Sequence, residues 1–81
     1  MVEETIMLRS IDDVKSFAAI ANTKKYDVDI VSGKYLINAK SIMGIFSLDL
    51  TKPLVMVAHT DTHGELLHQT AQFHYEPQVK K

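Results

Sequence analysis

The chain has 81 residues, a formal net charge of −1 and a hydrophobic fraction of 46%, which together predict a single small domain over residues 1–81. It has no cysteine, so disulfides and thiolate metal sites are excluded and a reducing compartment is compatible. Its only basic runs are Lys24-Lys25 and Lys80-Lys81, which argues against nucleic acid as a direct partner. No segment approaches the roughly 18 apolar residues of a membrane span. The opening Met-Val-Glu-Glu carries acid where a secretory signal carries base, so we expect a cytoplasmic protein.

The first expected elements are a strand and a helix. Residues 5–10 have an apolar centre of strand length, and residues 13–21 carry apolar side chains at helical spacing. Either Ser10 or Asp12 can cap this helix, because a short oxygen-bearing side chain accepts a hydrogen bond from a free helix amide. Capping is the simplest interpretation of Asp12. The helical pattern ends at Asn22.

A β-hairpin is expected next. Residues 26–31 alternate aromatic or branched side chains with acids, which indicates a strand with one face in water. Ser32-Gly33-Lys34 has the composition of a tight turn, because glycine tolerates the positive φ that such turns require. Tyr35–Asn38 would then be the returning strand.

A short and almost wholly apolar helix, opening at Ser41 and running to about residue 49, is the most distinctive predicted segment. Ser41 can cap it. A helix that is apolar on all sides is normally buried in a large protein. A chain of 81 residues is too small to cover such a helix completely, so some of Ile42, Met43 and Phe46 should face solvent or a partner.

The last third of the chain predicts a buried strand and a final helix. Leu54–Ala58 is the most apolar run and should form a central strand. Thr62 and Glu65 have the spacing of a capping box, and an apolar stripe follows over residues 66–74. Residues 78–81 are expected to be a loose tail. The order β-α-β-β-α-β-α predicts an α+β fold: a two-layer open-faced sandwich with a four-stranded, mainly antiparallel sheet and helices on one face.

This order and three short segments resemble the HPr family, the small phosphocarrier proteins of the bacterial sugar phosphotransferase system. The segments are Tyr26-Asp27, Lys40-Ser41-Ile42-Met43-Gly44 and Phe46-Ser47-Leu48. The similarity extends from about residue 5 to residue 73. It implies an HPr-like sandwich and a role in protein contacts.

The resemblance does not extend to the family's phosphohistidine. In the family that histidine caps the first helix, and an arginine two residues later steadies the phosphate. Counting back from Tyr26 places Asp12 at the histidine position and Val14 at the arginine position, and the first histidine of the chain is His59. The resemblance therefore implies a non-enzymatic protein without histidine phosphotransfer. Phosphorylation of Asp12 is disfavoured, because Asp13 is its only neighbouring carboxylate in place of a metal-binding acid cluster.

Ser41 matches the serine that a dedicated kinase phosphorylates in this family. A phosphate at a helix start meets free amides and the positive end of the helix dipole, and a partner's arginines can bind it. Ile42, Met43 and Phe46 would supply apolar partner-binding area beside it. This combination, in which the serine is present and the histidine is absent, is similar to that of the catabolite-repression HPr homologue of some Gram-positive bacteria. The implied partners are a serine kinase and a transcription regulator or another phosphotransferase-system component.

The remaining polar residues form no recognisable catalytic or metal site, and no cofactor is predicted. His63, His68 and His74 are five and six residues apart, whereas two imidazoles on one helix face need three or four. His59 belongs to the end of the preceding strand. The adjacent acids Glu3-Glu4 and Asp12-Asp13 sit at element ends, where solvated or capping roles are expected.

Three functional hypotheses follow. The leading one is a regulatory HPr-like protein of carbon metabolism with Ser41 as phosphosite. The second is a degenerate HPr-fold interaction or structural module, in which Ser41 only caps its helix. The third and least favoured is a phosphocarrier with an unusual acceptor. We expect a monomer or a weak homodimer, and in the second hypothesis the dimer would form through the apolar helix.

Overall fold

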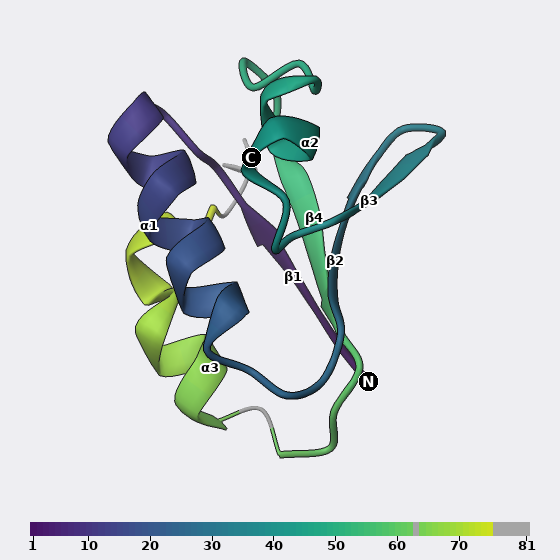
Figure 1. The fold of residues 1–81 in the computed structure, drawn as a ribbon, viewed down its shortest axis with the longest axis vertical. Coiled ribbons are helices and arrows are strands. Elements are labelled where there is room, and N and C mark those ends of the chain that lie inside the picture. The colour runs from purple at the N-terminus through teal and green to yellow at the C-terminus, as the bar shows by residue number, and fades with distance from the viewer. Residues whose placement is uncertain (63, 76–81) are drawn as a thin grey trace, which may run out of the picture.

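The computed structural model describes residues 1–62 and 64–75, and Figure 1 shows the path of the chain. The predicted order of elements, β-α-β-β-α-β-α, is confirmed. In chain order the elements are β1 (Val2–Ile6), α1 (Ile11–Asn22), β2 (Val28–Ser32), β3 (Tyr35–Asn38), α2 (Ile42–Phe46), β4 (Leu54–Ala58), α3 (Gly64–Gln69) and a 3-10 turn, Ala71–Phe73.

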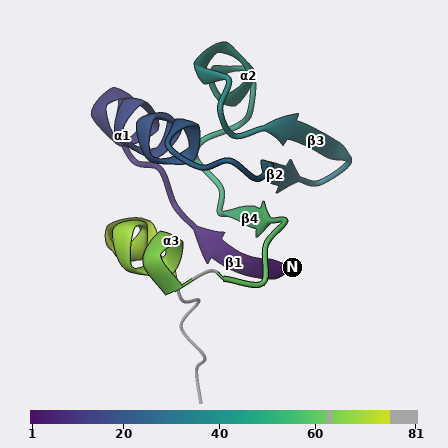
Figure 2. The same ribbon diagram turned by 60° about the horizontal axis from the view of Figure 1, so that its bottom comes forward.

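The four strands form one sheet in the order β1-β4-β2-β3, and each neighbouring pair is antiparallel. The three helices lie on the same side of this sheet, as Figure 2 shows. The predicted α+β open-faced sandwich is therefore confirmed, with β4 as a central strand. The other face of the sheet is not covered by a described helix.

The hydrophobic core lies between the sheet and the helices. On the sheet side it includes Ile6, Ile30 and Met56, all fully buried. Phe17 from α1 meets Phe73 from the 3-10 turn edge to face, with ring centroids 5.8 Å apart and planes at 83°. Such a pair adds to the burial of apolar area and ties the last described segment to the first helix.

The prediction for β1 was wrong in its bounds. The strand covers Val2–Ile6, whereas residues 5–10 were expected. It pairs with the whole of β4, from Val2 opposite Ala58 to Ile6 opposite Leu54. The partner strand therefore sets where β1 begins and ends. Its two acids are accommodated because Glu3 is exposed and Glu4 is half-buried beside His74.

The interpretation of Asp12 as a helix cap was also wrong. Ser10 is the cap of α1: its backbone is extended, and its hydroxyl oxygen accepts a hydrogen bond from the Asp13 N–H at 3.1 Å. The Asp13 carboxylate in turn accepts from the Arg9 N–H at 2.9 Å. Asp12 lies one residue inside the helix, exposed on its first turn.

The other differences concern element ends. α2 stops at Phe46 instead of about residue 49, because both the N–H and the hydroxyl of Ser47 bond the carbonyl of Gly44 and close the last turn. β2 begins at Val28 rather than at residue 26. The last helix ends at Gln69, and the 3-10 turn continues the chain.

Two turn predictions have different outcomes. The hairpin between β2 and β3 turns at Gly33-Lys34, and Gly33 has the expected positive φ of 58°. The predicted capping box of Thr62 and Glu65 spans residue 63, and the expected tail at 78–81 follows residue 75. Residue 63 and the tail lie outside the described residues.

Candidate functional site

Ser41 is exposed and caps α2, as predicted. Its hydroxyl oxygen accepts a hydrogen bond from the Gly44 N–H at 3.1 Å, and its carbonyl accepts from the Ile45 N–H at 3.1 Å. A Cβ on Gly44 would lie 3.2 Å from the Ser41 hydroxyl oxygen and 3.6 Å from Cδ1 of Ile37. Glycine at this position therefore leaves room for the hydroxyl and lets α2 pack closely on β3.

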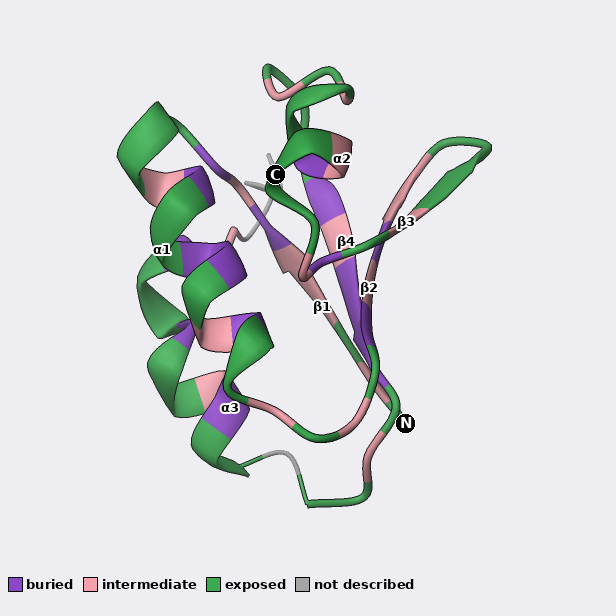
Figure 3. Ribbon diagram, in the orientation of Figure 1, coloured by how far each residue is buried: buried purple, intermediate pink, exposed green. Residues whose placement is uncertain are grey.

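The two faces of α2 differ in exposure, as Figure 3 shows. Ile45 points into the core and is fully buried. Ile42, Met43 and Phe46 are 38%, 79% and 40% exposed. The prediction that part of this apolar helix faces outward is confirmed for all three residues. We call these three side chains the outer face of α2.

The start of α2 is anchored to the end of α1. The amide of Asn22 donates to the Lys40 carbonyl at 3.1 Å, and Nζ of Lys40 donates to the Lys24 carbonyl at 2.9 Å. Nζ of Lys24 is bound in turn by the Glu65 carboxylate at 2.8 Å. That hydrogen bond and the lysine charge lower the pKa of Glu65 below its usual value. The side chains of Lys40 and Lys24 therefore connect the segment before α2, the end of α1 and the start of α3.

The start of α1 is acidic, because Asp12 and Asp13 both lie in its first turn. Val14, the next residue, is fully buried in the core. The side chain of Val14 is therefore not available at the surface of the helix start.

Two of the described histidines, His59 and His74, each lie beside a carboxylate. Nε2 of His59 lies 2.8 Å from Asp29 Oδ2, and Nδ1 of His74 lies 2.7 Å from Glu4 Oε1. His63 lies outside the described residues. Within residues 1–62 and 64–75, no three His, Cys, Asp or Glu side chains come close enough to hold a metal ion. In the same part of the chain, no helix has the length and apolarity needed to cross a membrane.

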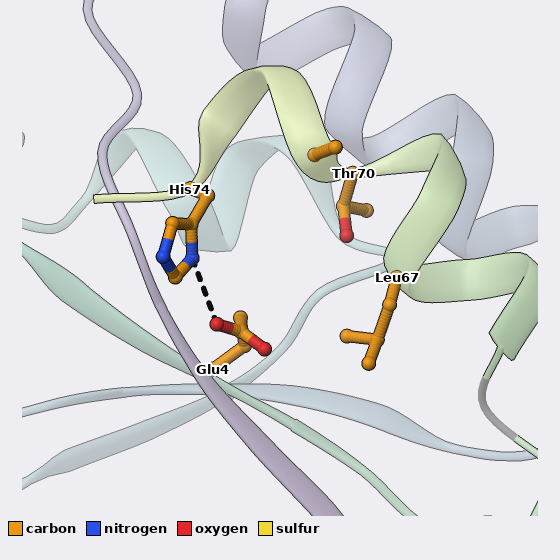
Figure 4. A pocket seen from close by; sticks show the side chains of 5 residues that line it. Glu4, Leu67, Thr70 and His74 are labelled. Carbon is orange, nitrogen blue, oxygen red and sulfur yellow. Dashed lines mark ion pairs between the residues drawn. The ribbon is translucent and has the colours of Figure 1, made fainter. Parts of the chain in front are cut away.

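The Glu4–His74 pair borders a small hollow of about 210 Å³ between β1 and the last turns of the chain (Figure 4). Glu4 faces the helices because it lies opposite Met56 in the sheet register. The hydroxyl of Thr70, also in the lining, donates to the Leu66 carbonyl at 2.9 Å. Sequence reasoning missed this hollow, since nothing in the sequence links Glu4 to His74. Glu4 and His74 bind each other and Thr70 binds the Leu66 carbonyl, which favours a structural role for these groups.

Comparison with known proteins supports the fold. No protein-family model and no curated protein matches the chain. Among solved structures it is similar to the crystal structure of HPr-C-His from Thermoanaerobacter tengcongensis. The TM-score is 0.74, the sequence identity is 24%, and the match covers 89% of each chain. The protein therefore has an HPr-like fold.

Proposed function

We propose that this protein is a non-catalytic HPr-like regulator of carbon metabolism that acts through protein contacts, with Ser41 as its phosphosite. The observation that supports this most is the outer face of α2 beside an exposed serine cap. Ile42 and Met43 follow Ser41 directly, and both are exposed. A partner that docks on these side chains would also reach the serine hydroxyl.

Phosphorylation of Ser41 is chemically suited to this position. The hydroxyl oxygen attacks the γ-phosphorus of ATP and gives up its proton to a base of the kinase. The bond between the γ-phosphorus and the β–γ bridging oxygen breaks, and phosphoserine and ADP result. The Gly44 N–H that now bonds the hydroxyl oxygen can bond a phosphate oxygen instead. The first turn of α2 has no acidic residue to repel the new charge.

Histidine phosphotransfer is not part of the proposal. Asp12 and the buried Val14 stand where the family has its phosphohistidine and its arginine. Incubation with phosphoenolpyruvate and the first enzyme of the phosphotransferase system should leave the mass unchanged. An acid-labile phosphate adduct would instead support the phosphocarrier hypothesis.

An interaction module without phosphorylation is the second candidate. The 79% exposure of Met43 favours it, because an apolar docking surface works without any modification of Ser41. The two candidates share the outer face of α2 and differ only in whether a kinase recognises it.

Binding of an HPr serine kinase to the outer face of α2 tests the proposal. In NMR spectra of the isotope-labelled protein, the backbone amide signals of residues 41–46 should shift or broaden when an HPr serine kinase is added. Met43→Lys, which places a charge on the outer face of α2, should weaken binding about tenfold or more. Gln69→Lys on the exposed side of α3 adds the same charge elsewhere and should bind like the parent. Equal weakening by both variants would contradict a docking site on α2, and absence of binding would leave only the interaction module.

A further inference from the structure

The two edge strands of the sheet, β1 and β3, differ in whether another backbone segment bonds to their outer side. At the β1 edge, residues after the 3-10 turn return along the strand. The Met7 N–H donates to the Phe73 carbonyl at 2.8 Å, the Tyr75 N–H donates to the Thr5 carbonyl at 3.0 Å, and Ile6 forms a bridge with His74. At the other edge, β3 pairs only with β2 among the described residues. Within the described residues, the β3 edge is therefore open around Leu36, while the Asn38 carbonyl at the end of the strand accepts the Ser41 N–H at 3.0 Å.

The backbone of Leu36 faces the open side of β3. In an antiparallel ladder, hydrogen-bonded pairs alternate with non-bonded pairs. The pair Ser32–Tyr35 closes the two-residue turn, and the Ala39 N–H donates to the Val28 carbonyl at 2.8 Å, so Leu36 falls at a non-bonded position. Its N–H and C=O therefore point away from β2, free to pair with another strand.

The side chains at this edge are apolar and exposed. Tyr35 and Leu36 are 67% and 66% exposed, and Figure 3 shows β3 as the least covered strand of the sheet. Leu36 lies opposite Val31, and Val31 lies opposite Val55, so the three form a stripe on the face without helices. An open strand edge flanked by apolar side chains is a template for pairing with another chain.

Tyr35 and Ile37 project from β3 on the helix side, beside a hollow of about 590 Å³. The hollow lies between the hairpin turn and the loop after α2. It is lined by Ser32, Gly33, Lys34, Tyr35, Ile37, Ser47, Leu48, Asp49 and Lys52. Tyr35 and Ile37 are two positions apart on one face of the strand, so the edge presents an exposed ring beside a recess whose lining is partly apolar and partly polar.

We infer that β3 is a self-association edge, at which a second copy of this chain pairs antiparallel about a twofold axis through Leu36. In that register the two Leu36 residues exchange both of their free backbone hydrogen bonds. Tyr35 of each copy falls opposite Ile37 of the other, at the mouth of the other copy's hollow. The interface is isologous, because the same patch of each copy supplies both the Tyr35 ring and the hollow beside Ile37. The assembly therefore closes at two copies.

The edge is self-complementary, and this favours a second copy over an unrelated peptide as its occupant. The strand has four residues, so the contact falls in the small-interface class below about 1,200 Å² and should be weak and concentration-dependent. It leaves the outer face of α2 unused and does not depend on Ser41.

Self-association is measured on the intact chain. Sedimentation equilibrium from about 20 µM to about 1 mM, concentrations that bracket weak affinities, should show an average mass rising from one copy toward two. In a mixture of isotope-labelled and unlabelled protein, intermolecular NOEs should link the Tyr35 ring to the Ile37 methyl groups. A single-copy mass at every concentration, or intermolecular NOEs confined to α2, would overturn the inference. So would a single-copy protein that binds an extended peptide at β3.

Variants locate the contact. Leu36→Pro removes the outward N–H without touching the ladder to β2, and Leu36→Lys adds a charge at the axis. Each should weaken self-association about tenfold or more, while Gln69→Lys should not. Far-UV circular dichroism checks the fold of each variant. A folded Leu36→Lys variant that dimerises like the parent would contradict the inference.

Discussion

The starts of α1 and α2 carry the same cap in different surroundings. Ser10 and Ser41 each accept a hydrogen bond from the N–H three residues later, both at 3.1 Å. The first turn of α1 holds Asp12 and Asp13, whereas the first turn of α2 holds no acid. A phosphate on Ser10 would meet two carboxylates, and one on Ser41 would not. The serine cap alone therefore does not distinguish the two helix starts, whereas the charge of the neighbouring side chains does.

The helices α1 and α2 also differ in how many buried side chains anchor them to the core. Over 12 residues α1 buries four side chains, including Val14 and Phe17. Over five residues α2 buries only Ile45. A short helix with one buried anchor opens locally more easily than a long one with several. The candidate regulatory site therefore lies on the less strongly held helix.

The largest expected effect concerns the anchor of α2. Ile45→Ala should lower the free energy of unfolding by about 2–5 kcal/mol, because it leaves a cavity under the helix. Met43→Ala on the outer face should change it by less than about 0.5 kcal/mol. Urea denaturation of both variants measures the difference. Similar losses would mean that the outer face of α2 is part of the core.

Removing either cap should have a smaller effect. Ser10→Ala and Ser41→Ala should each lower the free energy of unfolding by about 0.5–2 kcal/mol, because each leaves a helix N–H without its acceptor. Amide hydrogen exchange should place the change in the first turn of the affected helix. If Ser41→Ala is as stable as the parent and exchanges at the same rate, the cap of α2 is not an effective one.

A negative charge placed at each cap should change the stability of the protein differently at Ser10 and at Ser41. Aspartate also caps helices, so Ser41→Asp should stay within about 0.5 kcal/mol of the parent. Ser10→Asp adds a third carboxylate beside Asp12 and Asp13 and should be less stable than Ser41→Asp by about 0.3–0.5 kcal/mol. The gap should shrink in high salt. Thermal denaturation at low and high ionic strength tests this, and a gap of opposite sign would contradict the contrast.

The smallest effect is on the titration of Glu65 in α3, whose carboxylate binds Nζ of Lys24. Because Lys24 lowers the pKa of Glu65, Lys24→Met should raise it toward its ordinary value. Since the folded pKa lies below the unfolded one, the pair's contribution to stability is complete above the ordinary glutamate pKa and is lost as pH falls through the folded pKa. NMR titration of the Glu65 carboxyl carbon in both proteins measures the shift. Identical titration curves would show that the contact is absent in solution.

The order of elements could be predicted because its signals are local. Gly33 marks the hairpin, Leu54–Ala58 is long and apolar enough to be central, and Ser41 opens an apolar run. The bounds of β1 could not be predicted, because they follow from pairing with β4. The choice between Ser10 and Asp12 as the cap of α1 could not be predicted either, since both residue types cap helices and only the path of the chain decides.

The candidate site shows the same division. The exposure of Met43 followed from an apolar helix in a short chain. The anchoring of Lys40 by the end of α1, the pairing of Glu4 with His74 and the open edge of β3 are tertiary features without a local sequence signal. Such features become visible only when the chain is folded.

The most direct test of the regulatory proposal is the intact mass after incubation with an HPr serine kinase and ATP. Ser41→Ala and Ser10→Ala are treated in parallel, so the two caps are compared under one condition. We predict one added phosphate on the parent and on Ser10→Ala, and none on Ser41→Ala. Phosphate on Ser41→Ala, or none on the parent, would contradict the assignment of Ser41 as the phosphosite.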